Sequence, residues 1–268
     1  MELAGKTALL TGATGGLGRA IARALAERGA TVVASSRKLE ELAELTGSLP
    51  GSGHRTVVSD LGDEGAAGKL VAEAGDVDLL VANAGVPGTG LLESYDADQL
   101  ARAVRVNLEA PMQLARILSP PMRERGAGHI VFTASLAGKA AAPKSAIYSA
   151  TKAGLRGVGF SLREDLWESG VGVSVISPGF IRDAGMFHDS GAGAFGLGTS
   201  TPEEVSGAVI RAIERNRSEI VVAPLRQRLL ARFGHRYPEL AGRIGHRRLG
   251  KRVDIADRVA EGQVDKRS

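Results

Sequence analysis

Short apolar runs that alternate with helix-like runs are the feature that most constrains how this chain of 268 residues can fold. Such runs occupy residues 7–10, 31–34, 54–58, 77–81, 129–133, 171–177 and 220–222. Nearly continuous apolar character is typical of strands covered on both faces, and a helix between successive strands makes each connection a βαβ unit. The pattern predicts an α/β fold whose single, doubly wound sheet has about seven parallel strands.

A long helical pattern runs from about residue 96 to residue 118. It starts with the spacing of a capping box, Asp96 followed three residues later by Gln99, which satisfies backbone amides that a helix start leaves free. Proline has no amide hydrogen to donate. Pro111 is therefore predicted to kink this helix, and the pair Pro120-Pro121 to end its regular part.

Two further helices are predicted in the second half of the chain. One long helical pattern covers about residues 146–168. Another helix should start at Thr201, which fits an N-cap because Pro202 and Glu204 occupy the first and third helical positions. Residues 183–200 lie between them, contain five glycines and follow no regular period, so they are predicted to form a mobile loop.

Composition narrows the class of protein. The chain contains no cysteine, which excludes a disulfide framework or a thiolate metal site, and no metal site is expected. Its first residues do not follow the pattern of a signal peptide, and no apolar run approaches the roughly 20 residues that span a bilayer. We therefore expect a soluble, cytoplasmic protein. Nucleic-acid binding is disfavoured, because the basic part of the chain contains no recognisable reading module.

The positive charge is concentrated near the C-terminus. The whole chain carries a formal charge of +4, but residues 224–252 contain nine Lys or Arg and a single acid, Glu239. Leu225, Leu229 and Phe233 recur at four-residue intervals there, which predicts a short amphipathic helix. With no repeat or linker in sight, we expect one domain over residues 1–224 and a basic extension over residues 225–268. That extension could close the substrate pocket, contact another subunit, touch anionic lipid or attract an acidic carrier.

A glycine-rich turn follows the first predicted strand and opens a helix. Its residues are Thr11-Gly12-Ala13-Thr14-Gly15-Gly16-Leu17-Gly18. Glycines let the backbone turn tightly and approach a pyrophosphate, whose charge is held by free amides at the helix start. The position between a strand and a helix of a βαβ unit is the context that a dinucleotide-binding site requires.

Tyr148 and Lys152 form a pair that can transfer protons. They are four residues apart within a helical pattern, so their side chains should project from the same face. A nearby ammonium group favours the phenolate form of a tyrosine and lowers its pKa from about 10. Tyrosine in this setting can act as a general acid or base.

These motifs together resemble the classical short-chain dehydrogenase/reductases, a family of nicotinamide-dependent oxidoreductases. The resemblance covers roughly residues 5–224 and implies a Rossmann-type fold. The elements that match the family in order are the glycine motif at Thr11, Gly12, Gly16 and Gly18, the triplet Asn83-Ala84-Gly85, Asn107, Ser135, the pair Tyr148 and Lys152, and the turn Pro178-Gly179.

The resemblance implies a catalytic tetrad of Asn107, Ser135, Tyr148 and Lys152. In the family, the serine hydrogen-bonds the substrate oxygen and the tyrosine exchanges a proton with it. The lysine lowers the pKa of the tyrosine and binds the nicotinamide ribose, while the asparagine holds a water in a proton relay. Hydride transfer belongs to the cofactor, so the protein needs to position it and to manage one proton.

The resemblance also implies where the cofactor binds and which one is preferred. The end of the second strand carries Ser36 and Arg37 but no acidic residue that would bind a ribose 2′-hydroxyl and repel a 2′-phosphate, so we expect a preference for NADP(H) over NAD(H). The adenine should contact Asp60 and Leu61. The remaining cofactor contacts are expected at Gly12, Thr14, Gly16, Leu17, Gly18, Asn83, Ala84, Gly85, Tyr148, Lys152, Pro178, Gly179, Ile181 and Asp183.

Two departures concern the stretch after the Pro178-Gly179 turn. The family usually places a threonine near residue 183 that contacts the nicotinamide amide, whereas this chain has Asp183, which can accept but not donate a hydrogen bond. The predicted mobile loop then carries apolar side chains among its glycines, which favours a lid over a hydrophobic substrate. These side chains are Met186, Phe187, Phe195 and Leu197.

The sequence thus predicts an NADP(H)-dependent oxidoreductase that interconverts a carbonyl and an alcohol on a hydrophobic small-molecule substrate. The alternative is a non-catalytic protein that senses a dinucleotide on the same fold, because a fold alone does not fix a function. The intact tetrad favours the enzyme. The resemblance also implies a homo-dimer or homo-tetramer formed through the two long helices.

Overall fold

The computed structural model describes residues 1–140, 142–183 and 197–248. Within them the chain forms one seven-stranded sheet in the order β3-β2-β1-β4-β5-β6-β7, and every neighbouring pair of strands is parallel. This confirms the predicted doubly wound α/β fold. The strands are β1 (Thr7–Thr11), β2 (Thr31–Ser36), β3 (Arg55–Val58), β4 (Leu79–Ala82), β5 (Gly128–Thr133), β6 (Val171–Pro178) and β7 (Glu219–Val222).

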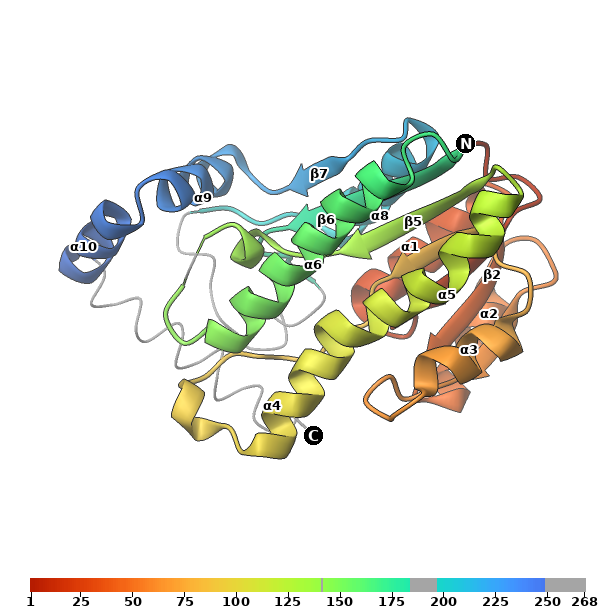
Figure 1. Cartoon of the computed structure of the whole chain (residues 1–268), viewed down its shortest axis with the longest axis horizontal. Helices are drawn as coiled ribbons and strands as arrows, with labels where there is room; N and C mark the ends of the chain where they lie inside the picture. The colour runs from red at the N-terminus through yellow and green to blue at the C-terminus, as the bar shows by residue number, and fades with distance from the viewer. Residues whose placement is uncertain (141, 184–196, 249–268) are drawn as a thin grey trace.

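Helices cover both faces of the sheet, as Figure 1 shows. One face carries α1 (Gly16–Glu27), α2 (Leu39–Ser48) and α8 (Pro202–Glu214). The other carries α3 (Ala66–Ala74), α5 (Ala110–Glu124) and α6 (Ala146–Asp165), with α4 (Ala97–Val104) leading into α5. The predicted capping boxes at Asp96 and Thr201 are both present.

Successive strand residues alternate between two separate cores. Leu9 pairs with Val33 of β2 and Leu80 of β4, and all three are buried in the core under α3, α5 and α6. The next residue of each strand faces the core under α1, α2 and α8, and these residues are Leu10, Ala34 and Val81. Each fully buried leucine contributes about 2 kcal/mol of apolar burial, which explains why the strands are apolar on both sides.

The long helix that contains Pro111 is interrupted, and its end differs from the prediction. A π-helical turn (Arg105–Glu109) separates α4 from α5, and Pro111 follows it at the start of α5. The prediction that Pro120-Pro121 ends the regular helix is wrong, because α5 continues to Glu124. Leu118 and Met122 lie one turn apart on its buried face, and their burial offsets much of the cost of about 3 kcal/mol for each interior proline.

The basic extension begins with two helices, α9 (Leu225–Arg236) and α10 (Pro238–Arg248). The predicted amphipathic helix at Leu225 is therefore present. Figure 1 shows both helices reaching outward from β7, past the ends at which β5 and β7 finish. In the portion of the chain that the structure describes, no helix is both long and apolar enough to cross a bilayer.

Candidate active site

The glycine-rich turn and the stretch after β4 meet where the winding of the sheet reverses, between β1 and β4. Gly12 has φ of +63°, and a Cβ there would lie 2.8 Å from the Cα of Ala84. A Cβ on Gly18 would overlap the carbonyl oxygen of Gly12. Only glycine allows both approaches, so the backbone forms a cradle without side chains.

The start of α1 fits a pyrophosphate. Its N-cap residue Gly15 is exposed and provides no side-chain cap for the first amides of the helix. Such amides, together with the helix dipole, attract an anion. Thr14, Gly16 and Leu17 are partly accessible beside it, so the predicted phosphate contacts lie together on one surface.

Asn83 fastens the stretch after β4 to the glycine turn. Its side-chain amide donates to the carbonyls of Thr11 and Gly12 at 3.3 Å each. The hydroxyl of Thr11 in turn accepts from the backbone amides of Asn83 and Ala84, both at 3.1 Å. Asn83 thus holds the ends of β1 and β4 together.

Asn107 is fully buried in the π-helical turn and forms two hydrogen bonds with the backbone of Val86. Its Oδ1 accepts from the amide of Val86 at 2.8 Å, and its Nδ2 donates to the carbonyl of the same residue at 2.9 Å. Pro111 has no amide to offer the carbonyl of Asn107 four residues earlier. A Cβ on Gly85 would lie 3.1 Å from Oδ1 of Asn107 and 3.6 Å from Nζ of Lys152, so Gly85 brings the two residues together.

Lys152 is buried beneath the end of β5. Its Nζ donates to the carbonyl of Thr133 at 2.9 Å. Burial lowers the pKa of Lys152 to about 8, because a charged ammonium loses its hydration there. The segment after β5 packs closely on this turn of α6, since a Cβ on Gly138 would lie 2.7 Å from the carbonyl of Lys152.

Ser135 and Tyr148 face one another at the mouth of this site. The hydroxyl of Ser135 accepts from the amide of Ala137 at 3.1 Å and lies 3.4 Å from the carbonyl of Pro178, to which it donates. Burial raises the pKa of Tyr148, and a hydrogen bond with Ser135 acts in the opposite direction. The start of α6 is fixed by the amide of Tyr148, which donates to the carbonyl of Gly88 at 3.2 Å.

The expected effect of Lys152 on Tyr148 is corrected by this geometry. The pKa of Tyr148 lies above its ordinary value rather than below it, because burial of the phenol dominates. Nζ of Lys152 is 5.8 Å from the centre of the tyrosine ring and is directed to the carbonyl of Thr133. The two side chains do share one face of α6, as their spacing predicted.

A carboxylate on β7 anchors the helix that carries Tyr148 and Lys152. Glu219 accepts from Arg156 of α6 at 3.0 Å, from Lys139 at 2.6 Å and from the hydroxyl of Ser177 at 2.8 Å. Burial alone would raise the pKa of Glu219, but these hydrogen bonds hold it below its ordinary value. Arg156 follows Lys152 by one helical turn, so Glu219 ties this part of α6 to the sheet edge.

At the end of β2 and β3, Asp60 is engaged by arginines. Its carboxylate accepts from Arg102 of α4 at 2.9 and 3.0 Å and from the amide of Gly62 at 2.8 Å, and Arg37 lies 3.8 Å away. Burial would raise the pKa of Asp60, but these hydrogen bonds and the two positive charges hold it below its ordinary value. The sequence analysis did not single out Arg102, because its partner is 42 residues distant.

The other cofactor contacts predicted at or after the ends of β2 and β3 are Leu61, Ser36 and Arg37. Leu61 is buried in the core under α3, α5 and α6. Ser36 caps the backbone after β2, where its hydroxyl accepts from the amide of Lys38 at 3.2 Å. Arg37 is half exposed beside Asp60, so the two side chains together mark the edge of the site.

Gln227 of α9 holds the turn that follows β6, which the sequence analysis did not foresee. Its side chain is buried, accepts from the amide of Phe180 at 3.1 Å and donates to the carbonyl of Gly198 at 2.7 Å. A Cβ on Gly179 would overlap its Oε1. The sequence carries no local signal for this role, because Gln227 lies between Arg226 and Arg228 and outside the Leu225-Leu229-Phe233 spacing.

Backbone pairing joins the two ends of the predicted loop over residues 183–200. Ile181 forms a parallel bridge with Ser200, with backbone bonds of 2.9 and 3.0 Å. Asp183 has φ of +64°, and its exposed carboxylate pairs with Arg182 at 3.3 Å. Of the predicted lid side chains, Leu197 is half-buried, whereas Met186, Phe187 and Phe195 lie outside the described residues.

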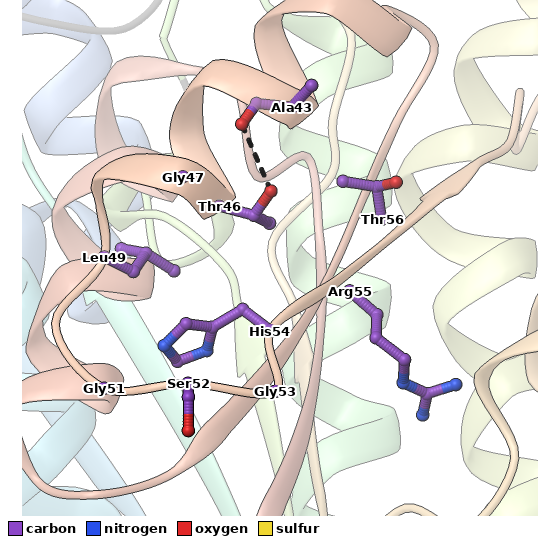
Figure 2. A pocket seen from close by; sticks show the side chains of 10 residues that line it. All are labelled: Ala43, Thr46, Gly47, Leu49, Gly51, Ser52, Gly53, His54, Arg55 and Thr56. Carbon is purple, nitrogen blue, oxygen red and sulfur yellow. Dashed lines mark hydrogen bonds between the residues drawn. The ribbon is translucent and has the colours of Figure 1, made fainter.

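A cavity lies at the opposite edge of the sheet. It has a volume of about 660 Å³ and is formed by the end of α2 and the loop before β3, as Figure 2 shows. His54 lines it and is held at both ring nitrogens, by the amide of Val32 at 3.1 Å and the carbonyl of Pro50 at 3.0 Å. Ligands of doubly wound sheets bind at the carboxyl ends of strands, whereas this cavity lies at the amino ends.

No cluster of three or more His, Asp or Glu side chains with the arrangement of a metal site occurs among residues 1–140, 142–183 and 197–248.

The candidate active site consists of the glycine cradle, the four tetrad residues and the turn held by Gln227. Its groups can bind a dinucleotide by its phosphates and exchange a proton with a bound oxygen. These are the parts that a nicotinamide-dependent reaction needs from the protein.

Comparison with known proteins identifies the family of the chain. The family model described as short chain dehydrogenase matches residues 6–194. A ketoacyl reductase, HetN from Nostoc sp., is 38% identical over 98% of this chain and 95% of its own length. A solved short chain dehydrogenase/reductase family protein superposes with a TM-score of 0.77 at 33% identity, covering 83% of this chain and 97% of the other. A metagenomic short-chain oxidoreductase in complex with NADP has a TM-score of 0.68 at 32% identity, covering 84% and 99%.

Proposed function

Because the chain belongs to the short-chain dehydrogenase/reductase family, we propose that it reduces a carbonyl group with NADPH, or oxidises the corresponding alcohol with NADP⁺, using Tyr148 as general acid and base. The observation that carries this proposal is the juxtaposition of Ser135 and Tyr148 above buried Lys152. A substrate oxygen between the two hydroxyls would accept a hydrogen bond from each. Tyr148 would give it a proton as the carbon is reduced.

Each group of the chain has a share in this reaction. The glycine cradle and α1 would hold the pyrophosphate, and bound NADP(H) would supply or accept the hydride. Lys152, with a pKa of about 8, still carries much of its charge near neutral pH and can bind a ribose hydroxyl. Asn107 fixes the stretch after β4 through the backbone of Val86, and this stretch includes Gly85 beside Lys152.

The preference for NADP(H) is proposed from the end of β2. Ser36 and Arg37 stand there, and Arg37 can pair with a 2′-phosphate. Asp60, whose carboxylate lies 3.8 Å from Arg37, is already engaged by Arg102, which reduces its repulsion of a phosphate. One structural relative is a complex with NADP.

A hydrophobic substrate is proposed from the loop beside Tyr148. Leu91 and Leu92 are about half exposed on the segment that Gly88 and Gly90 fasten to the start of α6. Exposed apolar side chains at the rim of a polar site favour a substrate with an apolar part. HetN is named a ketoacyl reductase, so 3-oxoacyl thioesters are the first substrate class to examine.

A homo-dimer or homo-tetramer is proposed through the long helices. Leu100 and Val104 are exposed one turn apart on α4, and Met112 is exposed on α5. Apolar side chains that line up on one exposed helix face are typical of an interface. Light scattering of the wild type and of Val104→Asp would test this, with a lower mass expected for the variant. Equal masses would contradict it.

The function is tested by following NADPH oxidation with a panel of ketones, aldehydes, quinones, steroids and 3-oxoacyl thioesters. With the best substrate, Tyr148→Phe should lower kcat by a factor of about 10² to 10⁴, because the proton donor is lost. Tyr237→Phe is the matched control, since this tyrosine is exposed on the C-terminal extension. Full activity of Tyr148→Phe would refute the proposed mechanism.

The alternative function, a dinucleotide sensor, gives a different result in the same experiment. A sensor would bind NADPH, measured by the fluorescence of the nicotinamide, and would oxidise it with none of the panel. The pairing of Ser135 with Tyr148 favours the enzyme, because a sensor gains nothing from a proton donor at that place.

A further inference from the structure

Helix α9 turns a leucine stripe away from the domain. Its buried residues are Gln227 and Ala231, which lie one turn apart and face the sheet. Leu225 and Leu229 each precede one of them by two residues, and two residues correspond to a rotation of about 200°. Accordingly Leu225 is 66% exposed and Leu229 is 53% exposed. The helix therefore docks through a polar amide and a small side chain, while its most apolar side faces outward.

Helix α10 continues this apolar surface. Leu240 and Ile244 are about half exposed and one turn apart, and Tyr237 is exposed between the two helices. Six of the fourteen large hydrophobic side chains that are exposed in the described part of the chain lie between residues 225 and 244. Concentrated exposure of this kind marks an interaction surface. We call Leu225, Leu229, Leu230, Tyr237, Leu240 and Ile244 the leucine face.

Arginines surround the leucine face. Arg228, Arg232, Arg236 and Arg243 are exposed on the same two helices, and Glu239 is the one acid between residues 225 and 248. The guanidinium of Arg236 lies 5.3 Å from the centre of the Tyr237 ring. Apolar and cationic side chains are thus interleaved rather than separated. The occupant must accept leucine and tyrosine side chains and carry negative charge around them.

A lipid bilayer with anionic headgroups has this combination. Leucine and tyrosine side chains enter the boundary between headgroups and acyl chains, while arginines reach the phosphates with their flexible stems. A second copy of the chain fits poorly, because its own α9 and α10 would bring arginines against arginines. Charge complementarity therefore favours the lipid surface over self-association.

Helix α9 packs beside the candidate active site. Gln227 connects α9 to the turn at Gly179, and Gly234 lies beside Ala140 in the segment that follows Ser135. In Figure 1, α9 and α10 extend past the carboxyl ends of β5 and β7. A membrane beneath these helices would thus be close to the place where a substrate enters.

We propose that α9 and α10 form a peripheral docking surface for an anionic bilayer, into which the leucine face inserts while the surrounding arginines bind headgroup phosphates. This surface does not depend on the proposed reaction, since it is built from residues outside the tetrad and the glycine cradle. Binding should be reversible and weaken with salt, because the charges act across water.

The test is co-sedimentation of the full-length protein with vesicles of phosphatidylcholine, with and without phosphatidylglycerol, at low and high salt. Wild type should sediment with the anionic vesicles at low salt. Arg228→Gln with Arg232→Gln should weaken partitioning on the order of ten-fold or more. Leu225→Gln with Leu229→Gln should weaken it comparably. All four side chains are exposed, so thermal unfolding should stay that of the wild type.

Matched controls lie elsewhere on the surface. Leu39→Gln removes an equally exposed leucine from α2, and Arg23→Gln an exposed arginine from α1. Both variants should bind vesicles as the wild type does. The proposal is overturned if wild type fails to sediment with anionic vesicles, binds neutral vesicles equally well, or loses binding with the controls. A drop in molecular mass of the double leucine variant without vesicle binding would show that a second copy covers the face.

Discussion

The side-chain amide of Gln227 fills the space beside Gly179 that any larger residue would need. From that position it reaches the amide of Phe180, which precedes the predicted lid, and the carbonyl of Gly198, which lies near the end of that segment. A helix of the C-terminal extension thereby holds the turn at which the resemblance places the nicotinamide. The extension is a structural part of the candidate site and not merely a charged appendage.

Replacing Gln227 should weaken cofactor binding. In Gln227→Ala the partly buried amide of Phe180 and the exposed carbonyl of Gly198 lose their partner, which costs about 0.5 to 1.5 kcal/mol each. We expect a lower melting temperature and a higher Kd for NADPH, measured by nicotinamide fluorescence. Gln113→Ala on the exposed side of α5 is the control. If Gln227→Ala binds NADPH as tightly as wild type, the hydrogen bonds of Gln227 have no role in the cofactor site.

Cofactor affinity should depend on the charge of Lys152. Its pKa is lowered to about 8, so the ammonium is lost as the pH rises through that value. NADPH is an anion, and we expect its Kd to rise about ten-fold between pH 7 and pH 9.5 as one nearby positive charge disappears. Lys152→Met should bind weakly at every pH in this range. A flat profile for wild type would contradict the assignment.

Arg37 should control the choice between cofactors. Arg37→Asp removes the cation proposed to bind the 2′-phosphate and adds a carboxylate that can accept from a 2′-hydroxyl. A charge-assisted hydrogen bond is worth about 1.5 to 3 kcal/mol, so the ratio of kcat/KM for NADPH over NADH should fall at least ten-fold. Arg23→Asp on the exposed side of α1 should leave this ratio unchanged. Better turnover of NADH by the wild type would refute the preference itself.

The stability of the fold should fall in mild acid because of His129. This histidine is buried in β5, where its Nε2 lies 2.8 Å from the hydroxyl of Ser174, which donates to the carbonyl of Arg217 at 2.6 Å. Burial lowers its pKa to about 3, and the charge of Arg163 acts in the same direction. Between pH 6.5 and pH 3 the unfolded chain therefore binds a proton that the folded chain does not.

The loss should amount to about 2 kcal/mol between pH 7.5 and pH 5. Urea unfolding of wild type and His129→Gln at both pH values would measure it, with a shallower pH dependence expected for the variant. Exposed His235→Gln is the control and should keep the wild-type slope. Parallel slopes for wild type and His129→Gln would show that another group causes the acid sensitivity.

Local patterns explain why most of the fold could be predicted. Strands such as Leu9-Leu10 are apolar at every position because their residues face two cores in turn. The glycine turn is recognisable because its glycines are contiguous in the sequence, although Gly12 approaches the distant Ala84. The error at Pro120 arose because burial of Leu118 and Met122 is decided by the whole fold. Proline propensity alone could not reveal it.

Pairings between distant residues could not be predicted. Gln227 binds Phe180 across 47 positions and Arg102 binds Asp60 across 42, and neither pair carries a local signal. The raised pKa of Tyr148 is of the same kind, because it depends on how deeply the neighbouring elements bury the phenol. Spacing placed Tyr148 and Lys152 on one helix face, but the direction of the lysine was set by the carbonyl of Thr133.

The bridge between Ile181 and Ser200 joins the two ends of the predicted loop over residues 183–200. Because backbone bonds join the chain on both sides of residues 183–198, a segment of other length or sequence could be grafted there without moving β6 or α8. Exchange of that segment, followed by assays with the substrate panel, would show whether the predicted lid sets the substrate range. Gln227 sets the boundary of such grafts, since the donor loop must still present a carbonyl to it.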